Sequence, residues 1–481
     1  MDWETVVGLE VHVQLRTRTK MFCADRTSFG DPPNTNVCPV CLGLPGALPV
    51  PNAEAIRLAT RAALALGCAV HATSVFARKN YFYPDLPKGY QISQFDKPLA
   101  TGGSVSFDSA ERGRVRVGIT RLHLEEDAGK LLHDRFPGKT AVDLNRAGIP
   151  LAEIVSEPDL RSPAEARAYL TTLRQILVYS GVSECSMEQG SLRVDANLSI
   201  RPSGESRLGT KTEVKNMNSF ANVERALEAE RARQVALLEG GRKVEQVTLL
   251  FNAGTGQVKP TRSKEESHDY RYFPDPDLPP LVLTSAWIAE QRATLPELPE
   301  AKRSRLETAY ALPAYDARVI TSEVELAQFF ESVVRQGVDP KIAANWVMGE
   351  VMTTYNERGE FPVSPERLAR LIGLVHDGTV SHQAAKRVYT ELAHSGDQDP
   401  RAVAERLGLV QVSDQGALVG WVEEVLAASP GEVARFRSGE TKLMAFFVGQ
   451  VMKRSKGKAD PKGVQPVLQE RLGQEAGSKA Q

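Results

Sequence analysis

Residues 7–15 alternate between apolar and polar side chains over the length of a strand. The odd positions are apolar, whereas the even positions include Glu10, His12 and Gln14. Successive side chains of a β-strand point to opposite faces of a sheet. The pattern therefore predicts a strand with one apolar face and one face that carries an acid, an imidazole and an amide.

The same alternation returns in three later stretches, each with a carboxylate on its polar face. These faces carry His123, Glu125 and Asp127 in residues 120–127, then Arg193, Asp195, Asn197 and Ser199 in residues 192–200, and Lys211, Glu213 and Lys215 in residues 210–215. An antiparallel sheet with one solvated face alternates in the same way, which is the alternative for any single strand.

Four such faces together favour a cation site. Like charges gathered in one cleft repel each other and need compensation. Oxygen ligands with one imidazole suit Mg²⁺ or Mn²⁺, and the lysines would meet phosphate oxygens. The chain contains neither a Gly-x-x-x-x-Gly-Lys-Ser/Thr loop nor a Gly-x-Gly-x-x-Gly turn that opens a helix. Side chains and metal on a sheet would therefore have to bind any nucleotide.

Two helices interrupt the strand-rich region from residue 1 to about 290. One helix follows a capping box that starts at Ser162, and it stops near Gly181. The other runs from about Asn222 to the glycines at 240–241. The proline-rich residues 273–280 read as an extended connector. Helical patterns follow from Leu295 to the end. There, residues 349–352 and 449–452 (Gly-Glu-Val-Met and Gly-Gln-Val-Met) suggest two similar helices.

The predicted fold class is α+β. A β-rich domain over residues 1–292 precedes an all-α domain over 293–407 and a small helical tail over 408–481. The 481 residues carry a net charge of −1, with 42% hydrophobic and 25% charged residues, as in ordinary soluble proteins. No signal peptide and no apolar run of about 18 residues is present. We expect a cytoplasmic enzyme or assembly subunit with no membrane partner.

Three local features add candidate chemistry. Residues 77–91 interleave three cations with three tyrosines, which suits phosphate and base contacts or a turn-rich loop packed on the sheet. Cys38 and Cys41 have Cys-x-x-Cys spacing and Cys23 precedes them, so a zinc site would need one more His or acid, and buried free thiols are the alternative. Residues 437–463 carry seven cations against two acids, which fits a solubilising helix end or a nucleic-acid contact.

Taken together, these stretches resemble the GatB family, the B subunits of the bacterial aspartyl/glutamyl-tRNA amidotransferases. The likeness extends over essentially the whole chain and is carried by residues 8–15, 34–46, 78–94, 122–130, 143–158 and 261–274. It implies a heterotrimer with an amidase (glutaminase) subunit and a small third subunit. It also implies a first domain shaped as a cradle, similar to glutamine synthetase.

The resemblance implies a two-step reaction. ATP phosphorylates the side-chain carboxylate of misacylated Glu-tRNA(Gln) or Asp-tRNA(Asn), and ammonia from glutamine reaches this site through a tunnel and displaces the phosphate. An acyl phosphate has a good leaving group that a free carboxylate lacks, and Mg²⁺ neutralises charge on the γ-phosphoryl oxygens. ATP and Mg²⁺, or Mn²⁺, are the expected cofactors.

Roles follow from the family's matching segments. Glu10, His12 and Glu125 match its cation-site segments, and Asp195 and Glu213 match two further acidic ones, so the metal set is Glu10, His12, Glu125, Asp195 and Glu213. Lys79 and Lys88 match basic strings that we assign to phosphate contact or to the mouth of the ammonia path. The expected catalytic residues are Glu10, His12, Glu125, Lys79 and Lys88.

Two further assignments concern the cysteine cluster, which departs from the family's four-cysteine pattern, and the positively charged tail. Some relatives have four cysteines, whereas Ala24 and Asp25 follow Cys23 here, which leaves zinc at Cys23, Cys38 and Cys41 open. The tail resembles the family's tRNA-contacting domain, and its expected contacts are Lys442, Lys453, Arg454, Lys456 and Lys458. The alternatives are a non-catalytic tRNA-binding scaffold in the same assembly and a free-standing ligase for small amino acids.

Overall fold

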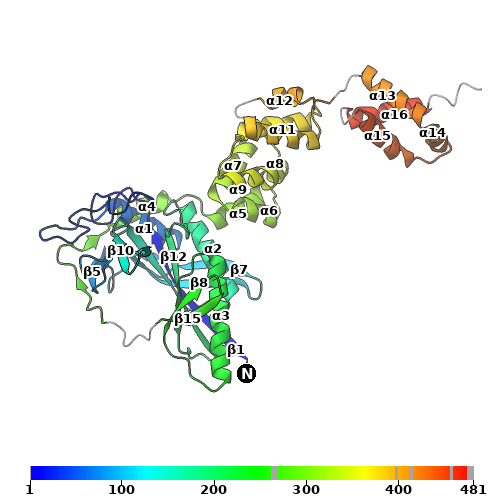
Figure 1. The fold of residues 1–481 in the computed structure, drawn as a ribbon. Helices are drawn as coiled ribbons and strands as arrows, with labels where there is room; N and C mark the ends of the chain where they lie inside the picture. Colours follow the sequence, from blue (N-terminus) through cyan, green and yellow to red (C-terminus); the bar gives the residue numbers. More distant parts are fainter. Residues whose placement is uncertain (1, 262–268, 396–398, 412–414, 456–458, 474–481) are drawn as a thin grey trace, which may run out of the picture. The chain divides into compact units, whose positions relative to one another are not determined.

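The computed structural model describes residues 2–261, 269–395, 399–411, 415–455 and 459–473. The chain forms two compact units, residues 1–302 and 303–481. The first is rich in strands and the second is helical (Figure 1), which confirms the predicted β-rich beginning and helical remainder. The finer three-part division of the sequence stays a prediction.

One large sheet dominates the first unit. Among the described residues it contains ten strands, antiparallel except for one parallel pair between β13 and β14. From edge to edge they are β15 (Gln257–Pro260), β14 (Thr248–Asn252), β13 (Thr212–Lys215), β12 (Leu192–Pro202), β1 (Trp3–Gln14), β11 (Pro150–Ser156), β8 (Gly113–Glu126), β6 (Ala100–Thr101) and β2 (Ala69–Val70), with β7 (Ser104–Ser109) paired to β8. The four strands predicted from alternation are β1, β8, β12 and β13.

Three helices cover the apolar face of this sheet (Figure 1). They are α1 (Ala53–Ala65), α2 (Pro163–Tyr179) and α3 (Phe220–Glu239). The Ser162 hydroxyl accepts a hydrogen bond from the backbone N–H of Glu165 and caps α2 as predicted. Helix α1 was not predicted from the sequence. Asn52 caps it by accepting hydrogen bonds from two backbone N–H groups. With their apolar side chains buried under helices, the strands turn their polar side chains to the other face.

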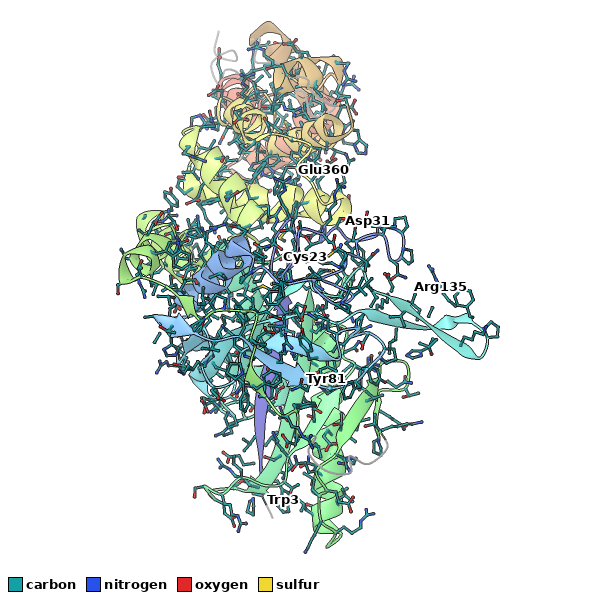
Figure 2. The ribbon with its side chains drawn as sticks, turned by 90° about the vertical axis from the view of Figure 1, so that its left-hand side faces the viewer. Trp3, Cys23, Asp31, Tyr81, Arg135 and Glu360 are labelled. Carbon is teal, nitrogen blue, oxygen red and sulfur yellow. The ribbon has the colours of Figure 1, made fainter. Side chains whose placement is uncertain are left out.

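Smaller sheets accompany the large one in the described part of this unit. The strands β16 (Phe273–Pro274), β4 (Ala77–Asn80) and β5 (Tyr90–Ser93) form one of them, β17 (Leu281–Val282) pairs with β3 (Thr73–Ser74), and β9 (Lys130–Phe136) pairs with β10 (Lys139–Asp143) in a projecting hairpin (Figure 2). The proline-rich connector supplies β16, and Asp275 just beyond it accepts a 2.8 Å hydrogen bond from Arg78. The connector is therefore fastened to the sheet unit. The short helix α4 (Ser285–Ala293) follows it.

Helices make up the second unit. The element α5 (Pro299–Ala309) spans the division, and α6 (Ala314–Ile320), α7 (Val324–Arg335), α8 (Pro340–Trp346), η1 (Val347–Val351), α9 (Met352–Arg358), α10 (Pro365–His376), α11 (His382–Ser395), α12 (Pro400–Arg406), α13 (Gln415–Ala428), α14 (Pro430–Arg437), α15 (Leu443–Arg454) and α16 (Pro461–Gly473) follow. Two separate hydrophobic clusters support them. Of the echoed segments, Gly349 lies in the π-helical η1 and Gly449 in the regular α15, so the two helices differ. Among the described residues, no helix is long and apolar enough to cross a membrane.

Candidate functional site

The register of the central strands brings polar side chains into rows across the sheet. His12 of β1 lies opposite Arg193 of β12 on one side and Glu153 of β11 on the other, and Glu153 in turn lies opposite His123 of β8. Glu10, two residues earlier on β1, lies opposite Asp195. Four strands therefore contribute acids, imidazoles and a guanidinium to one wall.

This wall lines a cavity of about 440 Å³. The predicted site residues that line it are Glu10, His12, Lys79, Glu125, Asp195 and Glu213. The remaining predicted residue, Lys88, is not among them. Its ammonium pairs with the Glu126 carboxylate, and both side chains are almost fully buried.

Three side chains from three strands converge as a candidate cation site. The Nε2 atom of His12 lies 3.6 Å from a carboxylate oxygen of Glu125 and 3.6 Å from one of Glu153. The three ligand atoms lie within 4.8 Å of one another, so one ion could contact all three groups. One nitrogen and several oxygens suit Mg²⁺ or Mn²⁺.

Burial sets the protonation of these groups. It raises the pKa of the Glu125 carboxyl to about 8, with the charge of Glu153 adding to the effect. Burial also opposes ionisation of Glu153, but the hydrogen bond and charge of His123 outweigh it and lower the pKa of Glu153 to about 2. The pKa of His12 is lowered by burial. At neutral pH without a cation, His12 is a neutral imidazole and Glu125 keeps its proton.

Cations compensate the acids toward the β12 and β13 side of the cavity. Arg193 donates to both oxygens of Asp127, at 2.8 and 2.9 Å. The Lys215 ammonium lies 2.7 Å from Asp195 and 3.1 Å from Glu213. Asp195 and Glu213 therefore share the cavity with the three converging ligands but stand beside Lys215.

Sequence reasoning missed Glu153. Its strand, β11, is buried along most of its length on both faces, so no alternation marks it. The available signal was a single acid inside an apolar run, Pro150 to Val155. The cost of burying a lone carboxylate requires a partner or a bound ion, and here His123 lies 3.2 Å from it.

Lys79 lies on the wall of the cavity beside two tyrosines. Its ammonium is 4.7 Å from the ring centre of Tyr270 and 5.8 Å from that of Tyr81, and both Lys79 and Tyr270 line the cavity. Lys79 could therefore meet an anion that enters there. Of the two alternatives for residues 77–91, contacts to a ligand and a packed loop, this lysine fits the first and the buried Lys88 fits the second.

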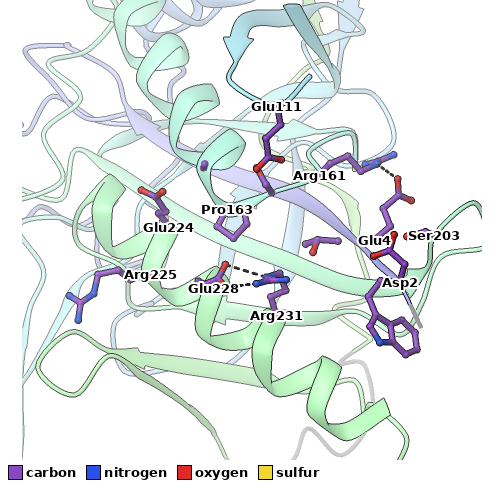
Figure 3. Close-up of a pocket in the computed structure, with 14 residues that line it drawn as sticks. Asp2, Glu4, Glu111, Arg161, Pro163, Ser203, Glu224, Arg225, Glu228 and Arg231 are labelled. Atoms are coloured by element: carbon purple, nitrogen blue, oxygen red, sulfur yellow. Dashed lines mark hydrogen bonds and ion pairs between the residues drawn. The ribbon is translucent and has the colours of Figure 1, made fainter. Parts of the chain in front are cut away.

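A second hollow lies near the start of α2 (Figure 3). It measures about 650 Å³. Arg161 lies 3.4 Å from Glu4, and Arg231 lies 2.5 Å from Glu228. Because these cations already have carboxylate partners, we assign no reaction to this hollow.

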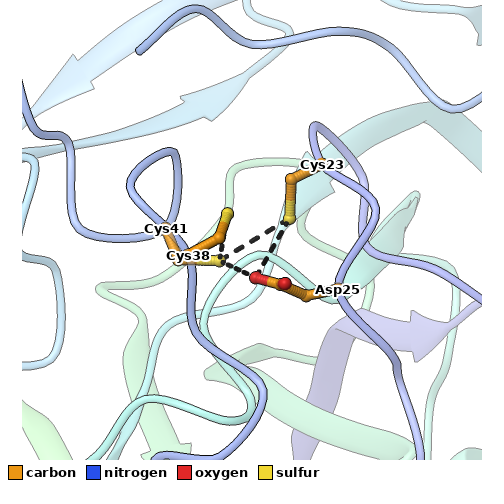
Figure 4. A group of neighbouring side chains, drawn as sticks. All are labelled: Cys23, Asp25, Cys38 and Cys41. Carbon is orange, nitrogen blue, oxygen red and sulfur yellow. Dashed lines mark hydrogen bonds between the residues drawn. The ribbon is translucent and has the colours of Figure 1, made fainter.

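The three cysteines meet an acid in a loop region of the first unit (Figure 4). Asp25 completes the group with Cys23, Cys38 and Cys41, and one ligand atom from each lies within 4.8 Å of the others. A zinc site at the three cysteines needs one more His or acid, and Asp25 lies within reach of them. A hydrogen bond from Cys23 is the main cause that lowers the pKa of Cys41 to about 6, which favours the thiolate that a metal needs.

The described tail residues lie at the two ends of α15. Lys442 precedes the helix, and Lys453 and Arg454 occupy its last turn, all exposed. Arg454 donates a 2.7 Å hydrogen bond to Glu424. Lys456 and Lys458 lie outside the described residues. Beneath this exposed charge the helix buries Phe447 and Val451.

Known proteins similar to this chain match it over nearly its whole length. A family model of the GatB/GatE catalytic domain matches residues 5–289, and one of the GatB domain matches residues 328–472. A protein of Moorella thermoacetica, named as the B subunit of an aspartyl/glutamyl-tRNA(Asn/Gln) amidotransferase, is 54% identical over 478 residues, which cover 98% of this chain and 100% of the relative. Relatives of the same name from Geobacter sulfurreducens and Prosthecochloris aestuarii are 52% and 51% identical and cover 98% of this chain and 100% and 98% of their own lengths.

Proposed function

The chain belongs to the GatB family, the B subunits of the aspartyl/glutamyl-tRNA(Asn/Gln) amidotransferases, and we propose that its acid cavity carries out both chemical steps of the reaction. In the first step, ATP phosphorylates the side-chain carboxylate of Glu-tRNA(Gln) or Asp-tRNA(Asn). In the second, ammonia converts the product to Gln-tRNA(Gln) or Asn-tRNA(Asn). The observation that carries this proposal is the convergence of His12, Glu125 and Glu153 in a cavity with Lys79 and Lys215.

Each step forms one bond and breaks one bond at the atom that is attacked. A carboxylate oxygen of the substrate attacks the γ-phosphorus of ATP, and the bond to the β-phosphate oxygen breaks to release ADP. The nitrogen of ammonia then attacks the acyl carbon, the bond to phosphate breaks, and the nitrogen loses a proton. Both steps gather negative charge in one place, which a cavity with fixed cations can stabilise.

His12, Glu125 and Glu153 would hold the divalent cation, and a bound Mg²⁺ supplies neutralisation of the phosphoryl oxygens. The neutral His12 offers a free ring nitrogen as a ligand. Glu10 contacts the Asn197 amide at 3.0 Å and adds a further acid to this side of the cavity. We assign Lys79 and Lys215 to contact with phosphate oxygens, for which Lys215 would give up part of its contact to Asp195 and Glu213.

Lys88 has a different role in the proposal. Burial and its pairing with Glu126 favour a place on the ammonia path over contact with phosphate. Ammonia would come from glutamine hydrolysed by an amidase (glutaminase) subunit, which is held together with this chain and a small third subunit in a heterotrimer. The large sheet would then act as a cradle of the glutamine synthetase kind, which also binds cations and phosphorylates a glutamyl carboxylate.

The deciding experiment uses the assembled complex with Glu125→Gln. We expect ATP-dependent formation of phosphorylated Glu-tRNA to fall roughly a hundredfold or more, because a residue that stabilises transition-state charge is lost. Glu157→Gln, an exposed acid just beyond β11, is the matched control and should be near normal. Undiminished ATP cleavage in Glu125→Gln would instead favour a tRNA-binding scaffold, and activity on free glutamate would favour a free-standing ligase.

The basic end of α15 is proposed to contact tRNA. Replacing Lys442, Lys453, Arg454, Lys456 and Lys458 with Ala should raise the KM for tRNA and leave the KM for ATP unchanged. Binding should also become less sensitive to salt, because fewer counterions are released from phosphates. Ala at Arg242 and Lys243, exposed cations after α3, serves as the control. An unchanged tRNA KM in the tail variant would refute this contact.

We also propose that Cys23, Asp25, Cys38 and Cys41 hold structural zinc. A full set of four ligands suits a closed structural site, and thiolates are its preferred donors. The fully buried Lys20 ammonium, 3.4 Å from the Cys41 sulfur, compensates part of the negative charge. Cys41→Ser should reduce zinc content from about one to near zero per chain and lower the Tm. Equal zinc in wild type and variant would contradict the assignment.

A further inference from the structure

Exposed aromatic side chains gather at one side of the acid cavity. Phe82 is 90% exposed, Tyr83 56% and Phe273 43%. Together with Tyr81 and Tyr270 they line a hollow of about 950 Å³ (Figure 2 labels Tyr81). Single exposed apolar residues are common, but several that surround one hollow mark a binding surface.

The hollow is held in shape by contacts between two distant segments. The backbone N–H of Asn80 donates to the Tyr270 carbonyl at 3.0 Å, and its side chain donates to the Arg271 carbonyl at 2.8 Å. Gly89 has a φ of +76°, and a Cβ there would lie 3.2 Å from the Phe82 ring. A glycine is therefore needed for the loop to carry Phe82 where it stands. The backbone that carries the aromatic side chains is thus fixed before any ligand binds.

The hollow continues into the acid cavity. Tyr270 lines both, and the Lys79 ammonium lies 4.7 Å from its ring centre. If the carboxylate of an aminoacyl group lies in the cavity, the ester that carries it is only a few bonds away. The ribose and base at the end of the RNA would then fall beside Tyr270.

We propose that this aromatic hollow binds the unpaired 3′-terminal nucleotides of the aminoacylated RNA by stacking their bases on Phe82, Tyr83 and Phe273. The inference rests on the proposed function and names how its RNA substrate is held at the same site. Single-stranded RNA ends are recognised by bases that stack on aromatic side chains. Stacking needs no base-specific hydrogen bonds because every base has a π-face.

The test uses the assembled complex with the double substitution Phe82→Ala and Phe273→Ala. Loss of a stacked base should raise the KM for Glu-tRNA about tenfold or more, with kcat at saturating tRNA and the KM for ATP nearly unchanged. Phe136→Ala, which removes a 54% exposed aromatic from the β9–β10 hairpin, is the matched control. An unchanged Tm would show that the double variant is folded.

A spectroscopic probe reports stacking directly. A tRNA with 2-aminopurine at its 3′ terminus should lose fluorescence on binding to wild type and to Phe136→Ala, and retain it with the double variant. An unchanged tRNA KM with equal quenching in all three proteins would overturn the inference. So would a raised KM for ATP alone, which would assign the hollow to the base of ATP. The Glu125→Gln variant tests phosphorylation separately. Failure of the proposed function can therefore be distinguished from failure of the stacking inference.

Discussion

The acid cavity and the cysteine cluster both gather metal-ligand side chains in the sheet-rich unit, but they are assembled differently. The cavity takes His12, Glu125 and Glu153 from three separate strands, so backbone register fixes their positions. The cluster takes its four ligands from residues 23–41, a stretch without a described helix or long strand. Rigid strands suit reacting groups that must not move, whereas a metal in a loop mainly closes the loop.

The two regions also differ in charge compensation. Arg193 and Lys215 neutralise acids on one side of the cavity. Among the three converging side chains, the Glu125 carboxyl keeps its proton at neutral pH. In the cluster, Lys20 is fully buried and donates to the Asn36 carbonyl at 2.6 Å as well as to Cys41. The cavity thus retains a deficit of positive charge that a bound cation can fill, whereas a buried ammonium already compensates part of the charge in the cluster.

The largest effect that would sharpen this comparison is expected at Glu153. Glu153→Gln should reduce phosphorylation of Glu-tRNA roughly a hundredfold or more, as for Glu125→Gln, because a cation ligand is lost. Cys41→Ser should leave kcat close to normal at a temperature where the variant is folded. The measurement is ATP-dependent formation of the phosphorylated product. If the cysteine variant lost as much activity as Glu153→Gln, the division into a catalytic and a structural centre would fail.

Period-two alternation explains how much of the cavity could be predicted. It places His12 and Glu125 on the polar faces of β1 and β8 without any knowledge of their neighbours. It does not reveal Glu153, because β11 is buried on both faces. Helix α1 was missed although its buried residues follow the 3.6-residue period, because several of them, such as Ala55, Ala59 and Ala62, are small and only weakly apolar.

Pairing between strands cannot be read from one strand. The sequence placed Asp195 and Glu213 with the metal ligands, and the resemblance to the family supported that choice. The contact of Asp195 to Lys215 follows from the pairing of β12 with β13. The contact of Glu213 to Lys215 joins two residues on one face of β13, which the alternation already indicated. Likewise, only the path of the loop shows that Asp25 reaches the cysteines.

A smaller effect concerns pH. The raised pKa of Glu125, about 8, means that its proton must leave when a cation binds at neutral pH. The apparent affinity for Mn²⁺ should therefore rise with pH, by up to about tenfold between pH 6.5 and 7.5, and level off above pH 8. Calorimetric titration with MnCl₂ in the absence of ATP measures it, and Glu125→Gln should abolish the slope. A flat affinity in the wild type would show that Glu125 is already ionised and that the two centres differ less than proposed.

The smallest expected effect is a gain at the cysteine cluster. Asp25→Cys replaces a carboxylate with a thiolate, and although the new side chain is one atom shorter, the zinc–sulfur bond is longer than the zinc–oxygen bond. The Asp25 oxygen lies 3.1 Å from the Cys41 sulfur, so the new sulfur can still reach the shared ion. Zinc affinity, measured by competition with a chromophoric chelator, should increase about threefold to tenfold because thiolates are the preferred donors. Phosphorylation of Glu-tRNA should not change, since a better structural ligand adds nothing to the charge in the cavity. Weaker zinc binding would mean that the loop geometry fits only the Asp25 carboxylate. A change in kcat would mean that the cysteine loop affects the catalytic groups on the sheet.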